Sequence, residues 1–464
     1  MAPMTVIKSD RLEPLEVLIA GGGVAGLEAL LALRALAGSR VRVTLLAPDP
    51  EFTYRPLSVG EPFGLTRPRR LDLKRIAADN EAHLRAGSLA SVDLARRVVR
   101  TSGGEELRFG ALVVAVGTRT SEALPGAVNF GGSESSQSMR RLLDQLGEGS
   151  VTKVAFALPA GSRWPLPLYE LALLTAREMP ARSLKDTGIT FVTPETRPLE
   201  AFPGEPSEQV EGMLLEAGVE VICSSSAESV VAGELRLADG RSVPADRVVT
   251  LPRLHVPDLP GIPQGANGFI PTDPLQRIEG MSDVYAAGDA TWFPIKHGGI
   301  AAQQADTAAE TIAAGVGVDV DPSPARLVLR GALLTASATR YLQAELGDPA
   351  APSITATGAL WWPPGKIAGR YLAPYLALHF GDEGQRDTLS DLSAAHAADP
   401  EGSDAAHAEA LSFALAGADA DARWGDYGGA LRWLDVAEQL NVVLPPEYAA
   451  RREEWQRDAR ASGR

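Results

Sequence analysis

The sequence LEVLIAGGGVAGLEALLALRALAG (residues 15–38) contains the main structural signal of the chain. Residues 15–20 are an apolar run that is too short for a helix and rich in branched side chains, which is typical of a buried strand. The turn GGGVAG (21–26) follows directly, and leucines then recur at helical spacing until Gly38. A second buried run, VRVTLL (41–46), comes next. This order predicts a βαβ unit with a parallel sheet.

The turn has the pattern Gly-x-Gly-x-x-Gly at Gly21, Gly23 and Gly26. We expect Gly21 to permit a tight turn, Gly23 to let a pyrophosphate approach the backbone, and Gly26 to let the helix pack closely on the strand. The amides of Val24 and Ala25 then lie at a helix N-terminus, where the helix dipole favours phosphate. The motif therefore predicts a dinucleotide-binding site.

One element of such a site is altered. The strand-end acid that usually binds a ribose hydroxyl falls near Ala47, where Ala and Pro precede Asp49. Two arrangements remain open: Asp49 reaches the ribose, or backbone groups and Arg55 hold it. A plain turn residue before Pro50 is the competing role for Asp49.

The alternation of short strands and helices continues, which indicates a second α/β block after the first. We expect strands at 97–101, 111–116, 154–158, 189–193, 219–223 and 247–251, with helices near 137–146, 166–178 and 206–217.

Two later strands end in glycine, VVAVGT (113–118) and VYAAGD (284–289). A turn and a helix follow the second one, over GIAAQQADTAAETIAA (299–314). Together with the first glycine turn, these elements resemble the dinucleotide-binding flavoproteins of the pyridine nucleotide-disulfide oxidoreductase superfamily. The resemblance implies FAD as the cofactor.

In that superfamily the Gly-Asp aspartate accepts a hydrogen bond from the flavin ribitol. The next helix points its N-terminus at the pyrimidine edge, where the dipole stabilises negative charge on the reduced ring. The cofactor-binding residues implied here are Gly21, Gly23, Val24, Ala25, Gly26, Arg55, Ala115, Gly117, Gly288, Asp289, Gly299, Ile300 and Ala301.

Two segments make the resemblance more specific, EFTYRPLSVGEPFG (51–64) and PIKHGGIAAQQA (294–305). Both are similar to segments of sulfide:quinone oxidoreductases and type II NADH dehydrogenases. The likeness covers residues 14–376. It implies an α/β fold with two dinucleotide-binding domains, Rossmann-like and of the glutathione reductase type, and a C-terminal α-helical extension. The expected parts are an FAD-binding domain (14–125 and 256–320), a degenerate second dinucleotide-binding-like domain (126–255), a C-terminal segment (321–380), and an acidic linker with a tetratricopeptide-like helical hairpin (381–464).

Two departures limit the chemistry. The sulfide enzymes use paired cysteines, whereas this chain has only Cys223, which we expect to be an inert thiol at a strand end. Arg163 and Trp164 stand where a thiol is expected. The NADH enzymes carry a second glycine motif after the strand at 154–158, but here PAGSRWPLP (159–167) follows, with three prolines that have no amide to donate. Conventional NAD(P)H binding is therefore not expected.

Three residues are candidate catalytic groups. Glu170 matches the glutamate that closes the corresponding turn in the sulfide enzymes, so its carboxylate is suited to relay protons. The alternative is a first-turn helix glutamate favoured by the dipole. Lys296 precedes the flavin-facing helix, where its ammonium either stabilises the anionic reduced flavin or lies in solvent. His297 is a candidate for the same role of stabilising the anionic reduced flavin, or for a proton donor.

Composition limits the partners. The chain has 464 residues with 44 basic and 59 acidic side chains, a net charge of −15, which argues against nucleic acid. Six histidines and one cysteine lack metal-ligand spacing, so we expect no metal centre. The first fifteen residues lack the apolar core of a signal peptide, which favours a cytoplasmic location.

The C-terminal part leaves alternatives open. ALWWPPGKIAGRYLAPYL (359–376) combines aromatic and basic residues, which suits peripheral contact with the inner face of a membrane. Ile367, Tyr371 and Tyr375 also have the spacing of a helix face that packs on the body, the arrangement that we favour. The helices expected in 405–464 either pack on the body or bind a protein partner.

The sequence thus predicts an FAD-dependent oxidoreductase without a cysteine redox pair. Electrons would pass from an unidentified small-molecule donor through the flavin to a quinone or another small acceptor. Two alternatives are an NAD(P)H-dependent flavin reductase with an unusual nicotinamide pose, and a flavoprotein without turnover that acts as an interaction or sensing module.

Overall fold

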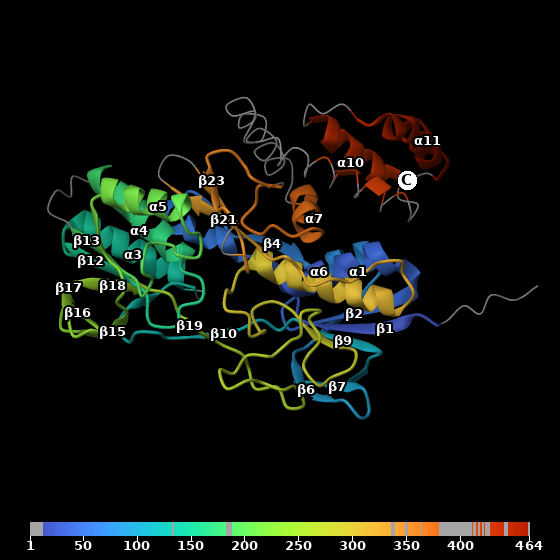
Figure 1. Cartoon of the computed structure of the whole chain (residues 1–464), viewed down its shortest axis with the longest axis horizontal. Coiled ribbons are helices and arrows are strands. Elements are labelled where there is room, and N and C mark those ends of the chain that lie inside the picture. Colours follow the sequence, from blue (N-terminus) through green and yellow to red (C-terminus); the bar gives the residue numbers. More distant parts are fainter. Residues whose placement is uncertain are drawn as a thin grey trace, which may run out of the picture.

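The fold is that of a computed structural model, in which two parallel sheets lie along the long axis of the molecule (Figure 1). A group of helices formed by the C-terminal part of the chain lies beside them. The structure describes residues 13–131, 134–181, 188–335, 339–348, 351–361, 363–379, 411, 414–415, 418–419, 422, 427–439 and 444–462.

The first sheet is built around β1 (Leu15–Ala20), which pairs in parallel with β2 (Val41–Ala47) and β9 (Ala111–Val114). β5 (His83–Ala86) lies at one edge and β20 (Val284–Ala286) at the other. The last strand comes from much later in the chain than the rest. Two distant segments therefore form one sheet, and they bring their strand ends to the same edge.

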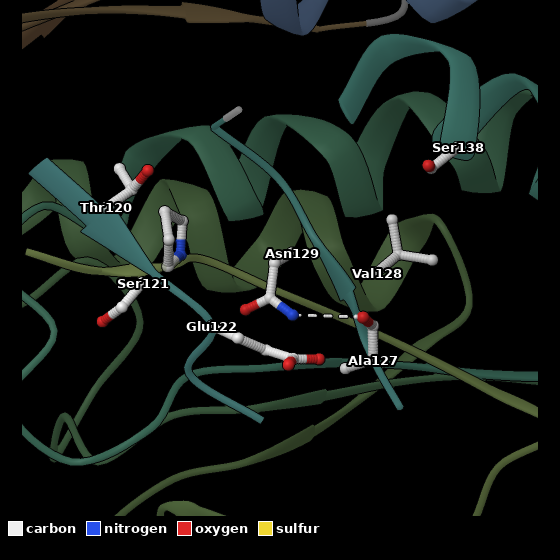
Figure 2. Close-up of a pocket in the computed structure, with 8 residues that line it drawn as sticks. Thr120, Ser121, Glu122, Ala127, Val128, Asn129 and Ser138 are labelled. Atoms are coloured by element: carbon white, nitrogen blue, oxygen red, sulfur yellow. Dashed lines mark hydrogen bonds between the residues drawn. The ribbon is translucent and has the colours of Figure 1, made fainter. Parts of the chain in front are cut away.

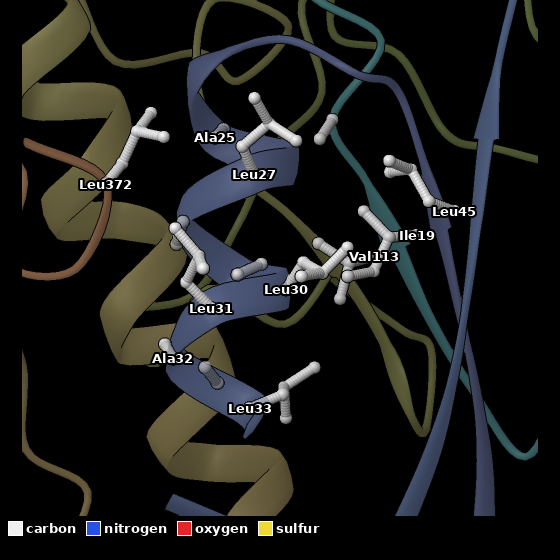
Figure 3. Close-up of a cluster of buried hydrophobic side chains, with 14 of the residues drawn as sticks. Ile19, Ala25, Leu27, Leu30, Leu31, Ala32, Leu33, Leu45, Val113 and Leu372 are labelled. Atoms are coloured by element: carbon white, nitrogen blue, oxygen red, sulfur yellow. The ribbon is translucent and has the colours of Figure 1, made fainter. Parts of the chain in front are cut away.

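Two helices, α1 (Val24–Ala37) and α6 (Gly298–Gly315), pack side by side over this sheet. Figure 3 shows the side chains of α1 between the strands on one side and α6 on the other. Leu27, Leu30 and Leu33 are all buried. Because α1 is covered on both sides, it is apolar around most of its circumference, as expected of a core helix.

The second sheet is also parallel, and helices cover it. Its edge strand β11 (Val128–Asn129) is not among the predicted strands. The other elements confirm the strands and helices predicted between 137 and 251, with ends shifted by one or a few residues. They are α3 (Ser135–Glu148), β12 (Lys153–Ala157), α4 (Leu166–Ala181), β13 (Gly188–Val192), α5 (Glu205–Glu216), β14 (Val219–Ile222) and β18 (Arg247–Thr250).

Small antiparallel sheets complete the fold. Only one of their strands, at 97–101, is predicted from the sequence. They are β3 (Glu51–Tyr54) with β4 (Arg69–Asp72), β6 (Leu89–Asp93) with β7 (Val98–Thr101) and β8 (Glu106–Arg108), β15 (Ala227–Val231) with β16 (Glu234–Leu237) and β17 (Ser242–Pro244), and β21 (Val328–Leu334) with β22 (Thr339–Glu345) and β23 (Ile354–Ala356).

The chain crosses between the two large sheets through β10 (Arg119–Ser121) and β19 (Arg253–His255), which pair antiparallel. A hollow beside this crossing is shown in Figure 2. The Asn129 amide lines it and donates to the carbonyl of Ala127 in its own loop (3.1 Å). None of the predicted site residues is among the described residues that line this hollow. The hollow therefore belongs to the crossing and not to the cofactor site.

The C-terminal helices α10 (Tyr427–Gln439) and α11 (Pro446–Ser462) share a buried cluster with the body of the protein. In this cluster Trp433 and Trp455 join Trp361 and Tyr341. Of the two alternatives for these helices, packing on the body is thereby confirmed. Trp361 is fully buried, as expected if the aromatic segment 359–376 packs on the body. Most of the expected acidic linker, from 380 to 410, lies outside the described residues. No helix in the described part of the chain is long and apolar enough to span a bilayer.

Candidate active site

The glycine turn between β1 and α1 has the geometry that its motif predicts. Gly21 has a φ of 129°, and a Cβ at this position would overlap the carbonyl of Ala115. A Cβ at Gly26 would overlap the carbonyl of Gly21. At Gly23 a Cβ would meet nothing within 4 Å, so the backbone there faces open space at the start of α1. This is the space that a pyrophosphate needs.

The separate motifs meet at Gly288, just after β20. A Cβ on Gly288 would lie 3.1 Å from the Cβ of Ala25 and 3.4 Å from the Cβ of Ala301. The backbone N–H of Gly288 also donates to Oε1 of Gln304 on α6 (2.8 Å). The N-termini of α1 and α6 therefore converge on one strand end. Their positive ends favour negative charge in the same place.

Asp289 follows this junction and is half-buried. Burial raises its pKa, while the positive charges of Lys296 and Arg55 oppose that rise. Within the described residues its carboxylate accepts no hydrogen bond. It is thus free to accept one from a bound ligand.

The remaining predicted cofactor residues occupy different environments. Gly117 has a φ of 66° and no neighbour that a Cβ would touch within 4 Å. Val24 and Gly299 lie in the first turns of α1 and α6. Ile300 is 1% exposed and packs in the core of the second sheet, so only its backbone can serve a cofactor.

Lys296 is buried, which makes its alternative as a solvated loop lysine wrong. Its Nζ donates to the carbonyls of Thr291 and Phe293 (2.7 Å for Phe293) and lies 4.0 Å from the ring centre of Phe269. Burial lowers its pKa, the charge of Arg163 acts in the same direction and Asp289 opposes both, which brings the pKa to about 8. The ammonium is therefore fixed at the start of α6.

His297 is the N-cap of α6 and is buried. Its Nδ1 accepts the N–H of Gly299 (3.2 Å), and its ring lies 4.6 Å from the ring of Trp164. Burial lowers its pKa to about 4, and the charge of Lys366 acts in the same direction. The imidazole is consequently neutral at pH 7, with its proton on Nε2.

Glu170 lies on α4 with no exposed surface. Its Oε1 accepts the N–H of Leu334 (2.7 Å) and forms an ion pair with Nζ of Lys366. Its Oε2 is buried without a hydrogen-bond partner in the described structure, and burial raises its pKa. The first turn of α4 contains no acidic residue, so the helix-dipole alternative is wrong.

Lys366 pairs with the predicted residue Glu170, and no sequence pattern indicated its place here. It belongs to the segment 363–372, here named the strap, which crosses the body near the start of α6. The N–H of Ile367 donates to the Tyr54 hydroxyl (2.9 Å), and a Cβ on Gly298 would press on Ile367. The strap thus brings Lys366 to Glu170, close enough for its charge to act on His297. No spacing in the sequence indicates this, because the partners lie far apart along the chain.

Residues 15–311 match the family model described as pyridine nucleotide-disulphide oxidoreductase. The chain belongs to this family. It is an FAD-dependent oxidoreductase, and FAD is the cofactor that its glycine turn fits. The open backbone at Gly23 and the free carboxylate of Asp289 suit the pyrophosphate and the ribitol of that cofactor.

Solved structures share the fold of this oxidoreductase at low sequence identity. A sulfide:quinone oxidoreductase from the hyperthermophilic bacterium Aquifex aeolicus has a TM-score of 0.68 at 20% identity, over 74% of this chain and 87% of that one. A ferredoxin reductase from Rhodopseudomonas palustris has a TM-score of 0.52 at 20% identity, over 71% of this chain and 81% of that one. A search among curated proteins gave no match.

Proposed function

We propose that this oxidoreductase passes electrons from a small-molecule donor through FAD to a quinone or a similar small acceptor, without a cysteine pair. The observation that carries the proposal is the buried ion pair of Glu170 and Lys366 beside His297. FAD, when bound, supplies an electron carrier that accepts and delivers electrons in separate steps.

A quinone that takes up two electrons also takes up two protons, so its site needs a proton source. Glu170 has a raised pKa and one buried oxygen without a partner, which suits a carboxyl that holds a proton for transfer. Lys366 lies against its other oxygen and stabilises the carboxylate that remains once this proton has been transferred. The neutral Nε2–H of His297, at the start of α6, can donate a hydrogen bond to the acceptor but holds no proton for transfer.

The lone thiol supports a mechanism without cysteine. Cys223 follows β14 and is half-buried, and burial with nearby carboxylates raises its pKa. A thiol with a raised pKa is a weak nucleophile at neutral pH. The sulfide:quinone oxidoreductase among the structures of similar fold supports a quinone as the acceptor.

Two features of the second sheet speak against NAD(P)H as the donor. The turn after β12 carries Pro165 and Pro167, which donate no amides to a phosphate. The acid that follows β13 is Glu195, in the region where such folds bind a ribose. Its carboxylate is already taken by the hydroxyls of Tyr169 (2.6 Å) and Thr193 (2.8 Å).

The test is reoxidation of the flavin under anaerobic conditions. The purified holoprotein is reduced chemically and mixed with a soluble short-chain quinone in a stopped-flow instrument, while the visible flavin band is followed. We expect rapid return of the band in the native protein. Glu170→Gln should slow it by roughly a hundredfold, the scale of a lost proton-transfer group.

Two matched variants complete the experiment. Glu216→Gln removes an exposed carboxyl from the end of α5, and Cys223→Ser removes the thiol; both should reoxidise at the native rate. A reduced native protein that no quinone reoxidises would overturn the proposal. Equal rates in Glu170→Gln and the native protein would remove Glu170 from the mechanism.

A further inference from the structure

Arg163 is a cation without a counter-ion in the part of the chain that the structure describes. It lies in the turn between β12 and α4 and is half-buried. Its carbonyl accepts the N–H of Lys296 (3.3 Å), but its guanidinium makes no hydrogen bond or ion pair with the described residues. A guanidinium has five N–H donors, and no described side chain or carbonyl accepts from those of Arg163, which is only partly exposed. The guanidinium is therefore available to an acceptor that a ligand supplies.

The guanidinium is held in place by an aromatic ring. Its central carbon lies 4.6 Å from the ring centre of Phe269, which is buried. The backbone of Phe269 is fixed by Asn267 Oδ1, which accepts its N–H (3.0 Å), and by the N–H of Gly265, which donates to its carbonyl (2.8 Å). The ring is thus a rigid platform that orients Arg163 before any ligand arrives.

A second cation shares this platform. Nζ of Lys296 lies 4.0 Å from the same ring centre, and the charge of Arg163 disfavours its protonation. Two like charges close together are unfavourable unless an anion compensates them. Asp289 interacts with Lys296 and with Arg55, but it is not paired with Arg163. The resulting local positive charge contrasts with the net charge of −15 of the chain.

The position of the pair limits the kind of anion. Lys296 lies just before α6, the helix whose N-terminus would face the flavin ring, whereas the pyrophosphate of FAD would lie at Gly23, the N-cap of α1. The turn around Arg163 lacks the amides of a phosphate cradle, because Pro165 and Pro167 occupy it. These positions favour a small anionic group over a phosphate chain.

We propose that Arg163 binds the anionic group of the electron donor, and that this donor is a small molecule with a carboxylate or an oxyanion of similar size. The assignment rests on the proposed function for the place of the donor beside the flavin. Lys296 attracts the anion through its positive charge alone, because its ammonium protons already donate hydrogen bonds to two backbone carbonyls.

Sulfite is the probe for this site, because it is a small oxyanion that binds to oxidised flavins and bleaches their visible band. The holoprotein is titrated with sulfite at constant ionic strength, and acetate is added as a competing carboxylate. We expect Arg163→Gln to raise the Kd for sulfite at least about tenfold, as for a lost charge-assisted hydrogen bond. Acetate should compete with sulfite in the native protein and much less in the variant.

The control is Arg236→Gln, which removes the same charge from an exposed position on β16. It should leave the Kd for sulfite unchanged, and Arg163→Lys should lose less affinity than Arg163→Gln. An unchanged Kd in Arg163→Gln would overturn the proposal. Loss of FAD from that variant would overturn it as well, since Arg163 would then hold the cofactor. The two tests fail separately: a native protein that quinone does not reoxidise would overturn the proposed function, whereas the sulfite Kd of the native protein and of Arg163→Gln is measured without any quinone.

Discussion

The carboxyl groups of Glu28 and Asp306 are hydrogen bonded to each other between α1 and α6. Glu28 is fully buried, and its two oxygens accept the N–H groups of Tyr371 (2.6 Å) and Leu372 (2.8 Å). Burial raises the pKa of both carboxyls, and the charge of Glu28 raises that of Asp306 well above its usual range. Asp306 therefore keeps its proton and donates it, while Glu28 holds the strap.

This pair makes stability depend on pH. Because the folded state binds protons that the unfolded chain releases above the ordinary carboxyl pKa of 3.8, the free energy of unfolding should fall as pH rises from there through the raised pKa of Asp306. Asp306→Asn retains a hydrogen-bond donor that cannot ionise. We expect a flatter pH profile of the melting temperature and a higher value than native at alkaline pH. Asp258→Asn, an exposed control, should follow the native profile.

The glycine turn allows loss of cofactor to be separated from loss of folding. Gly23→Val adds a side chain in open space, so the protein should fold, but the branched group fills the space of the pyrophosphate and FAD should be lost. Gly26→Ala puts a methyl group onto the Gly21 carbonyl and should lower the melting temperature instead. Flavin absorbance and far-UV circular dichroism give the two readouts. A yellow Gly23→Val protein with full occupancy would refute the turn assignment.

Asp289→Ala should weaken FAD binding by about 1.5–3 kcal/mol, the range for a hydrogen bond to a charged group. The half-buried carboxylate has no other hydrogen-bond partner among the placed residues, so its removal breaks no internal bond. The Kd for FAD is measured by titrating apoprotein and following the quenching of flavin fluorescence. An affinity equal to native would place the ribitol contact elsewhere.

A chain that ends after His379 tests the C-terminal helices. It retains α7 (Leu372–His379) but loses Trp433, Leu434 and Trp455 from the buried cluster that contains Trp361. We expect a lower melting temperature, increased binding of a hydrophobic dye and full FAD occupancy, because the cofactor motifs lie before residue 315. Loss of FAD would show that these helices take part in the cofactor site.

Local pattern was enough to predict β1, the glycine turn and α1, since neighbouring residues determine their geometry. The strand ends at Gly117 and Gly288 were recognisable for the same reason. The environment of Lys296 and His297 was not, because their burial depends on Phe269 and Trp164 from other parts of the chain. Similarly, the small antiparallel strands are short and carry weak alternation, so periodicity missed most of them.

The strap has a consequence for synthesis on the ribosome. The hydrogen bond from Leu372 to Glu28 spans 344 residues, so Glu28 cannot gain its backbone donors until nearly the whole chain has been translated. Until then α1 carries a carboxylate in an otherwise apolar surface, and β20 is also missing from the edge of the first sheet. The nascent N-terminal part therefore stays incompletely closed through most of elongation, with apolar surface exposed.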